Sequence, residues 1–149
     1  MRIVIQRVKR ASVSVEEKVV GSIQKGFLVL IGVGQGDDEA TADKYMKKLL
    51  GLRIFEDENG KMNLSVKETN GKILAVSQFT LLGDVRKGKR PSFTKAARPE
   101  EAQSLYRRVI ENIISQGIDV EEGIFQEEML VEIYNDGPVT ILLDSNKKF

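Results

Sequence analysis

The chain has 149 residues, 41% of them hydrophobic, which is enough for one domain to bury roughly two-thirds of its unfolded surface. It contains neither Cys nor His, which excludes disulfides, thiol nucleophiles, imidazole bases and most transition-metal sites. The net charge of +1 indicates no particular partner, and no stretch approaches the roughly 20 apolar residues that span a bilayer. Because residues 1–5 begin a strand pattern and lack a signal-peptide profile, we expect a cytoplasmic protein with a single domain over residues 1–149.

The basic residues gather in two windows without acids, residues 1–10 and residues 85–98. These windows hold ten basic residues and leave 13 basic against 22 acidic residues elsewhere. Such segregation favours local attraction of a polyanion. The alternative is that the two windows are simply solvated.

The first half of the chain predicts strands followed by a helix. Residues 2–8 and 11–15 alternate apolar and polar side chains, and residues 18–23 are typical of a return strand. The continuous apolar run at residues 26–33 predicts a central strand covered on both faces. Glycines follow it, and a strand that leads into glycines and then a helix can indicate a nucleotide-binding loop. We reject that interpretation, because the acids at residues 37–39 would repel a phosphate. These acids instead satisfy the first amides of a helix over residues 38–50.

The second half predicts a further strand layer and one long helix. Short strands are expected at residues 53–55 and 61–66, around a turn at residues 57–60, and a second apolar strand at residues 72–82. A basic loop at residues 83–98 precedes a helix that begins at Pro99 and ends at Gly117. Strands at residues 120–122, 124–134 and 139–143 follow, the last two joined as a hairpin.

The predicted strands outnumber the helices about two to one, and two helices are long enough to cover a sheet. The pattern therefore predicts an α/β fold: a mixed, partly barrel-like sheet with two main helices on one side, in α/β/β layers.

Two short stretches stand out from this background. The sequence SQFTL at residues 77–81 places polar side chains in a run that otherwise predicts a buried strand, and NDGPVT at residues 135–140 combines residues that favour turns. The pair resembles the two signature motifs of the D-aminoacyl-tRNA deacylases. The similarity extends to residues 1–8, to GKMN at residues 60–63 and to RPSF at residues 90–93.

The resemblance implies a homodimeric hydrolase that cleaves the ester between a D-amino acid, or glycine, and the 3′-terminal adenosine of tRNA. It also implies that Gly137 and Pro138, joined by a cis peptide bond, enter the active site of the opposite subunit. There they would reject an L side chain and leave L-aminoacyl-tRNA uncleaved. The aminoacyl-tRNA substrate is then the expected nucleic-acid partner, with neither DNA nor a membrane.

The resemblance also implies three groups of site residues. Expected in the chemical step are Ser77, Gln78, Phe79 and Thr80. Expected around the substrate are Arg7, which could equally be a surface charge, and Ala102, Phe125 and Met129, whose residue types by themselves favour ordinary core. Lys87, Lys89 and Arg90 are candidates for contacts with tRNA phosphates.

The missing His bears on the mechanism. Thr80 and Ser77 are the evident hydroxyl nucleophiles in the motif, but neither has an imidazole partner. We therefore favour attack by water, with amides near Phe79 and Thr80 stabilising the oxyanion and the ribose 2′-hydroxyl assisting. The structural alternative is that both hydroxyls merely bond a neighbouring strand.

Two other functions compete with this hypothesis. A non-catalytic module that binds tRNA or other RNA would use the basic windows and leave the ester intact. A metal-dependent hydrolase built on Asp57, Glu58 and Asp84 is disfavoured, because these acids lack a ligand spacing and His is absent. We expect neither a metal nor a cofactor.

Overall fold

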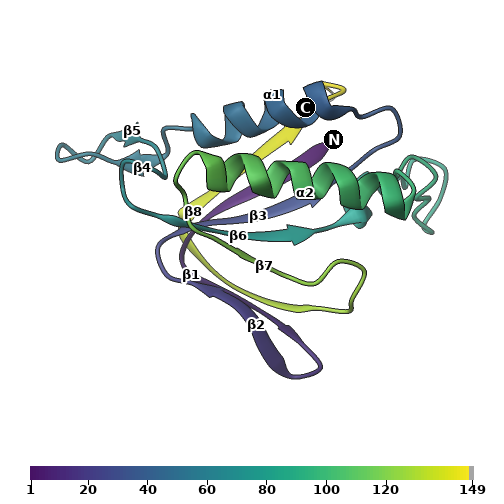
Figure 1. The fold of residues 1–149 in the computed structure, drawn as a ribbon, viewed down its shortest axis with the longest axis horizontal. Coiled ribbons are helices and arrows are strands. Elements are labelled where there is room, and N and C mark those ends of the chain that lie inside the picture. The colour runs from purple at the N-terminus through teal and green to yellow at the C-terminus, as the bar shows by residue number, and fades with distance from the viewer. Residues whose placement is uncertain (148–149) are drawn as a thin grey trace.

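The fold is built on β1 (Arg2–Val15), which pairs along both of its edges (Figure 1). On one edge, β8 (Leu130–Asp144) runs antiparallel to it almost from end to end. On the other edge, β3 (Gly26–Gly32) pairs with its first half and β2 (Lys18–Ile23) with its second half. The structure is a computed structural model that describes residues 1–147, so Lys148 and Phe149 of the predicted domain lie outside the described residues.

Strand β3 connects this antiparallel part to a parallel part. β6 (Lys72–Ser77) pairs parallel to β3, and β7 (Val120–Glu122) pairs parallel to β6, giving the strand order β2-β1-β3-β6-β7. A small antiparallel pair, β4 (Phe55–Glu56) and β5 (Met62–Leu64), lies outside this sheet. Each parallel connection contains a helix, as parallel strands require a long crossover.

The two helices, α1 (Glu39–Leu50) and α2 (Pro99–Ser115), lie side by side over one face of the sheet (Figure 1). Asp38 caps α1, because its Oδ1 accepts a hydrogen bond from the Thr41 amide at 2.8 Å. The bonds from Thr41 lower the pKa of Asp38. The expectation that an acid satisfies the start of this helix is therefore confirmed. Among the described residues no helix is long and apolar enough to cross a membrane.

The sheet carries a hydrophobic core on each face. Alternate residues of β3 explain this, because Phe27, Val29 and Ile31 pack towards the helices while Leu28 packs on the opposite side. The second core lies within the curl of the sheet, where β2 approaches β7 so closely that a Cβ on Gly21 would lie 2.8 Å from the Glu122 carbonyl oxygen. The predicted fold, a mixed barrel-like sheet with two helices on one side, is confirmed.

Three strand predictions were wrong. β6 ends at Ser77, opposite Ile31 of β3, because the chain turns there into a 3-10 helix, η1 (Phe79–Leu82). Residues 124–129 form an irregular segment with Gln126 at φ 66°, so the strand that was expected from residue 124 begins at Leu130. The predicted hairpin is absent from the described residues: residues 130–144 continue in one direction as β8, because both halves pair with the same strand β1.

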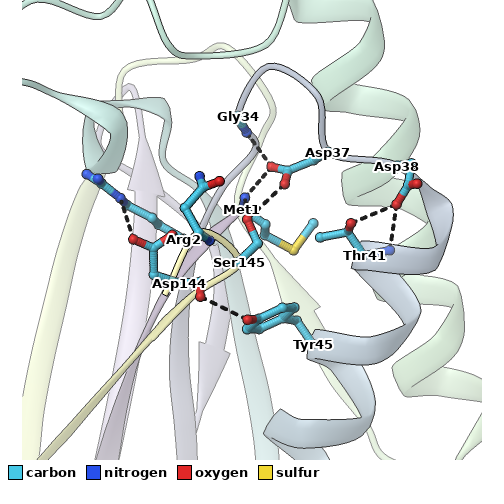
Figure 2. Close-up of polar contacts among 10 residues, drawn as sticks. Met1, Arg2, Gly34, Asp37, Asp38, Thr41, Tyr45, Asp144 and Ser145 are labelled. Atoms are coloured by element: carbon cyan, nitrogen blue, oxygen red, sulfur yellow. Dashed lines mark hydrogen bonds and ion pairs between the residues drawn. The ribbon is translucent and has the colours of Figure 1, made fainter. Parts of the chain in front are cut away.

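A polar cluster fastens the start of β1 and the end of β8, which lie side by side, to the segment before α1 (Figure 2). The buried ammonium of Met1 pairs with Asp37 and donates to Ser145 Oγ at 2.5 Å. Asp37 also accepts from the Gly34 amide at 2.6 Å, and the Tyr45 hydroxyl donates to the Asp144 carbonyl at 2.8 Å. The acids after β3 thus bind cationic and amide groups of the protein itself.

Candidate active site

The SQFTL motif lies where β6 ends and the backbone turns sharply. The Gln78 amide donates to the Ile31 carbonyl at 2.8 Å, which is the last contact of this strand with β3. The Leu81 amide then bonds the Gln78 carbonyl at 3.3 Å and the Gly83 amide bonds the Thr80 carbonyl at 3.0 Å. A helix leaves its first amides without partners inside the helix. The turn therefore presents the amides of Phe79 and Thr80 at the end of a buried strand.

A cavity of about 490 Å³ opens at this turn. Six of the sequence-predicted site residues line it: Ser77, Gln78, Phe79, Ala102, Phe125 and Met129. They come from the end of β6, from α2 and from the irregular segment before β8, so residues far apart in the sequence share one concave surface. A pocket with an apolar lining and a few polar groups is the usual form of a small-ligand site.

Tyr106 of α2 connects β6 to the cavity residue Phe125. Its hydroxyl donates to the Ala75 carbonyl in β6 at 3.1 Å, and its ring lies 6.3 Å from that of Phe125. Burial, followed by the nearby Glu122 carboxylate, raises the pKa of the Tyr106 hydroxyl, so it stays a protonated donor. Tyr106 therefore fixes the strand that carries Ser77.

Within residues 1–147, neither candidate hydroxyl nucleophile has a base beside it. Thr80 is exposed, lies outside the cavity lining, and accepts a hydrogen bond from the side-chain amide of Gln78. The Ser77 hydroxyl is half-buried and makes no side-chain hydrogen bond within residues 1–147. The arrangement thus offers amide donors at the turn but no activated side-chain nucleophile.

Arg2 of β1 stabilises the turn by a hydrogen bond. Its Nη1 donates to the Leu81 carbonyl at 2.8 Å, while its Nε lies 3.5 Å from the fully buried carboxylate of Asp144 (Figure 2). Gly32 allows the close approach of η1 to β3, since a Cβ there would lie 2.8 Å from the Gln78 carbonyl oxygen. Sequence reasoning missed Arg2, because nothing in the sequence indicates that residues 2 and 81 meet.

The second motif forms a bulge in β8. Between Gln6 and Val8 the strand β1 advances two residues, whereas their partners on β8, Thr140 and Asn135, are five residues apart. The extra residues include the Gly137–Pro138 pair, whose peptide bond is cis and whose members are both exposed. Neither residue lines the cavity of its own chain.

Arg7 and Asn135 hold the bulge in place. Arg7 is 5% exposed, so it is not a surface charge, and its Nη1 donates to the Ile54 carbonyl at 2.7 Å. Its Nε donates to the Asp136 carbonyl at 3.1 Å. Asn135 Oδ1 accepts from the Val139 amide at 2.8 Å and thereby closes the bulge. The motif is thus fixed by side chains from two strands.

The two basic windows differ in the structure. In the first, Arg7 is buried and Arg2 is paired, so residues 1–10 do not form a uniform basic patch. In the second, Arg86 and Lys95 pair with Asp84, which directly precedes the window, and the bonds from Arg86 hold the pKa of Asp84 well below its usual range. The three predicted tRNA contacts in this window are exposed and have no ion-pair partner within residues 1–147: Lys87, Lys89 and Arg90.

Three further features are relevant to the site. Sequence reasoning missed Gln126 and Glu127, which also line the cavity, because this segment was expected to be a strand. A second cavity of about 490 Å³ lies between the C-terminal ends of α1 and α2 and contains none of the predicted residues. Within the described residues, no group of three or more acidic side chains could hold a metal ion.

The sequence matches one protein family over most of its length. A family model described as "D-Tyr-tRNA(Tyr) deacylase" matches residues 4–144. The chain is 61% identical to a D-aminoacyl-tRNA deacylase of Koribacter versatilis and 58% identical to one of Thermotoga petrophila. Both alignments run over 149 residues and cover 100% of each chain.

Solved structures share the fold. One, described as "c-Myc DNA Unwinding Element Binding Protein", superposes with a TM-score of 0.91 at 40% identity, covering 97% of this chain and 99% of that chain. Another, described as "Structural Analysis of a probable eukaryotic D-amino acid tRNA deacylase", superposes with a TM-score of 0.79 at 19% identity, covering 95% and 97%. At that identity the second match shows the fold alone.

Proposed function

This chain belongs to the D-Tyr-tRNA(Tyr) deacylase family and is a D-aminoacyl-tRNA deacylase, a hydrolase, and we propose that it cleaves D-aminoacyl and glycyl esters of tRNA. The bond broken would be the ester to the 3′-terminal adenosine, with residues 1–149 acting as one domain. The observation that carries the proposal is the cavity at the end of β6, where Ser77, Gln78 and Phe79 face residues of α2 and of the segment before β8. The substrate would place the protein in the cytoplasm.

The arrangement fits a mechanism in which backbone amides stabilise the transition state. Attack on the ester carbonyl places negative charge on its oxygen, and the amides of Phe79 and Thr80 at the start of η1 would stabilise that charge. Water is the nucleophile, because neither motif hydroxyl has a base beside it in the described residues. The 2′-hydroxyl of the terminal ribose lies next to the ester in the substrate and assists the proton transfer. The motif side chains therefore position the ester.

Discrimination between D and L esters is assigned to Gly137 and Pro138 of a second subunit. The pair is exposed, is absent from its own cavity lining and directly follows Asp136, whose carbonyl accepts a hydrogen bond from Arg7. A backbone wedge fixed in this way can exclude a side chain by steric contact while it accepts a hydrogen or the opposite configuration. The filter therefore requires a homodimer in which each bulge completes the cavity of the other subunit.

The remaining predicted residues would bind the rest of the substrate. Ala102, Phe125 and Met129 supply the apolar wall of the cavity and would contact the adenine or the aminoacyl group. Lys87, Lys89 and Arg90 carry exposed charges that would neutralise phosphates of the acceptor stem. Affinity for tRNA should then fall as the salt concentration rises.

The test is hydrolysis of matched D-aminoacyl-, L-aminoacyl- and glycyl-tRNA, measured with a chelator present. We expect cleavage of the D and glycyl esters and sparing of the L ester. A double variant, Gly137→Ala with Pro138→Ala, should lose this discrimination, whereas the exposed Glu16→Gln should keep it. Equal cleavage of L and D esters by the wild-type protein would contradict the proposed filter, and sensitivity to the chelator would restore the metal-dependent alternative.

A second candidate is a nucleic-acid-binding module without catalysis. The observation in its favour is the solved relative at 40% identity, whose name describes that protein as one that binds a DNA element. This candidate predicts that the protein binds tRNA or DNA while the lifetime of every ester stays unchanged. The hydrolysis assay separates the two functions directly.

A further inference from the structure

An exposed aromatic ring stands at the mouth of the cavity. Phe79 is among the residues that line the cavity, and it is 56% exposed. Its ring meets that of Phe93 edge to face, with centroids 5.2 Å apart and planes at 71°. The Phe79 ring is thus supported by Phe93 on one side, while more than half of the residue is exposed to solvent. An exposed aromatic ring beside a substrate cavity can stack on part of the bound substrate.

The supporting ring is itself fixed by the basic loop. Asp84 and Ser92 exchange two backbone hydrogen bonds, each of 2.9 Å, which close the loop directly before Phe93. Gly83 leaves room for that ring, because a Cβ there would lie 3.0 Å from Phe93 Cε1. Arg86 is held by Asp84 at the same point. Phe93 therefore supports Phe79 from a closed loop.

The same loop carries the exposed cations Lys87, Lys89 and Arg90. An aromatic ring beside a positively charged surface is the combination that proteins use to bind single-stranded nucleic acid, because any base stacks on the ring and the charges follow the phosphates. The terminal adenosine of the proposed substrate is preceded by a short single-stranded segment. A chain that leaves the cavity past Phe79 would meet this loop.

We propose that Phe79, supported by Phe93, is a stacking platform for the base of the nucleotide that precedes the terminal adenosine of tRNA. The inference rests on the proposed function and adds a subsite for the same substrate. The backbone amide of Phe79 acts on the ester, while its ring binds the neighbouring nucleotide. The platform makes the enzyme prefer an ester carried by tRNA over the same ester carried by adenosine alone.

The experiment compares kcat/KM on D-aminoacyl-tRNA with kcat/KM on the matching 3′-D-aminoacyl-adenosine. In Phe79→Leu, which keeps an apolar side chain without a ring, the ratio of the two values should fall by about tenfold. Phe79→Trp should keep the ratio, and Phe93→Leu should lower it less. Val85→Ala, which shortens another exposed apolar side chain of the loop, is the control and should leave the ratio unchanged.

Two results would overturn the platform. One is an equal loss on both substrates in Phe79→Leu, which would mean that the ring only shapes the turn. The other is a changed sedimentation coefficient of this variant, which would mean that a second subunit covers the ring.

If the wild-type protein cleaves neither ester, the proposed function fails, and affinity for uncharged tRNA then tests the platform by itself. Phe79→Leu must then weaken binding of intact tRNA but not of tRNA shortened by its last two nucleotides.

Discussion

The guanidinium of Arg7 on β1 donates its Nε to the carbonyl oxygen of Asp136 on β8 at 3.1 Å. The same side chain is so close to the next residue that a Cβ on Gly137 would lie 2.9 Å from Arg7 Nη2. Gly137 has φ at 124°, a conformation that L side chains rarely adopt. The proposed filter is thus positioned by one buried cation and by a residue that must lack a side chain.

Replacing Arg7 with Lys should loosen the filter. Lys keeps the charge but loses the planar fork that reaches Ile54 and Asp136 together, which leaves the buried Ile54 carbonyl without its donor. We expect the free energy of unfolding to fall by about 1–3 kcal/mol and the hydrolysis of L-aminoacyl-tRNA to rise relative to D. Urea unfolding and initial rates measure the two effects. The exposed Arg53→Lys is the matched control, and a wild-type D-to-L ratio in Arg7→Lys would refute the positioning role.

Replacing Thr80 with Ala should leave most of the activity. Its hydroxyl contacts the Gln78 amide and no base, so its loss removes a positioning contact only. We expect kcat to fall by no more than about tenfold, whereas loss of a true nucleophile costs on the order of 10⁶-fold. Single-turnover hydrolysis of D-aminoacyl-tRNA gives the chemical step directly. A complete loss of that step, with folding and tRNA binding intact, would instead establish Thr80 as the nucleophile.

Replacing Asp37 with Asn should destabilise the protein strongly. Met1 is fully buried, and the variant leaves its N-terminal ammonium without the negative charge of Asp37 (Figure 2). Breaking a buried ion pair by removing one partner costs about 3–5 kcal/mol in the free energy of unfolding. Asp119→Asn is the matched control, because its partner Lys72 is half-exposed and such pairs contribute about 0–1 kcal/mol. Equal urea midpoints for the two variants would show that the Met1–Asp37 pair is unimportant.

The stabilisation that the ion pair between α1 and α2 gives to the fold should depend on pH. Arg108 Nε and Nη2 each donate to the Asp43 carboxylate at 2.8 Å, and these bonds, with one from Asn112, lower the pKa of Asp43 from 3.8 to about 2. Because the pKa is lower in the folded state, the stabilisation is fully present above pH 3.8 and is lost as the pH falls through about 2.

This pH dependence can be measured with Asp43→Asn. The difference in melting temperature between the wild type and the variant should be constant above about pH 5 and should shrink between about pH 4 and pH 2. Glu128→Gln, an exposed change of the same charge, serves as the control. A difference that stays constant down to about pH 2 would show that the Asp43–Arg108 pair does not stabilise the helix contact.

The sequence determined the elements whose patterns depend on near neighbours in the chain. The spacing of apolar residues predicted both helices, and the continuous run at residues 26–33 predicted a central strand that packs on both faces, as Phe27 and Leu28 do. The resemblance of two short motifs predicted the family, and the family model confirms it. Residue types alone also excluded a His- or Cys-based mechanism.

Only the tertiary structure decided how the separate segments meet. The turn-forming residues at 135–138 are compatible with a hairpin or a bulge, and pairing of both flanking segments with the single long strand β1 selects the bulge. Likewise, β6 ends at Ser77 because the chain turns into η1 before it pairs with Gly32, the last residue of β3, and no local preference indicates this end. Arg2 reaches Leu81 and Arg7 reaches Asp136 across large separations in sequence, so these contacts depend on strand register. Short-range periodicity carries information about which face a residue occupies, whereas register is fixed only when the whole sheet assembles.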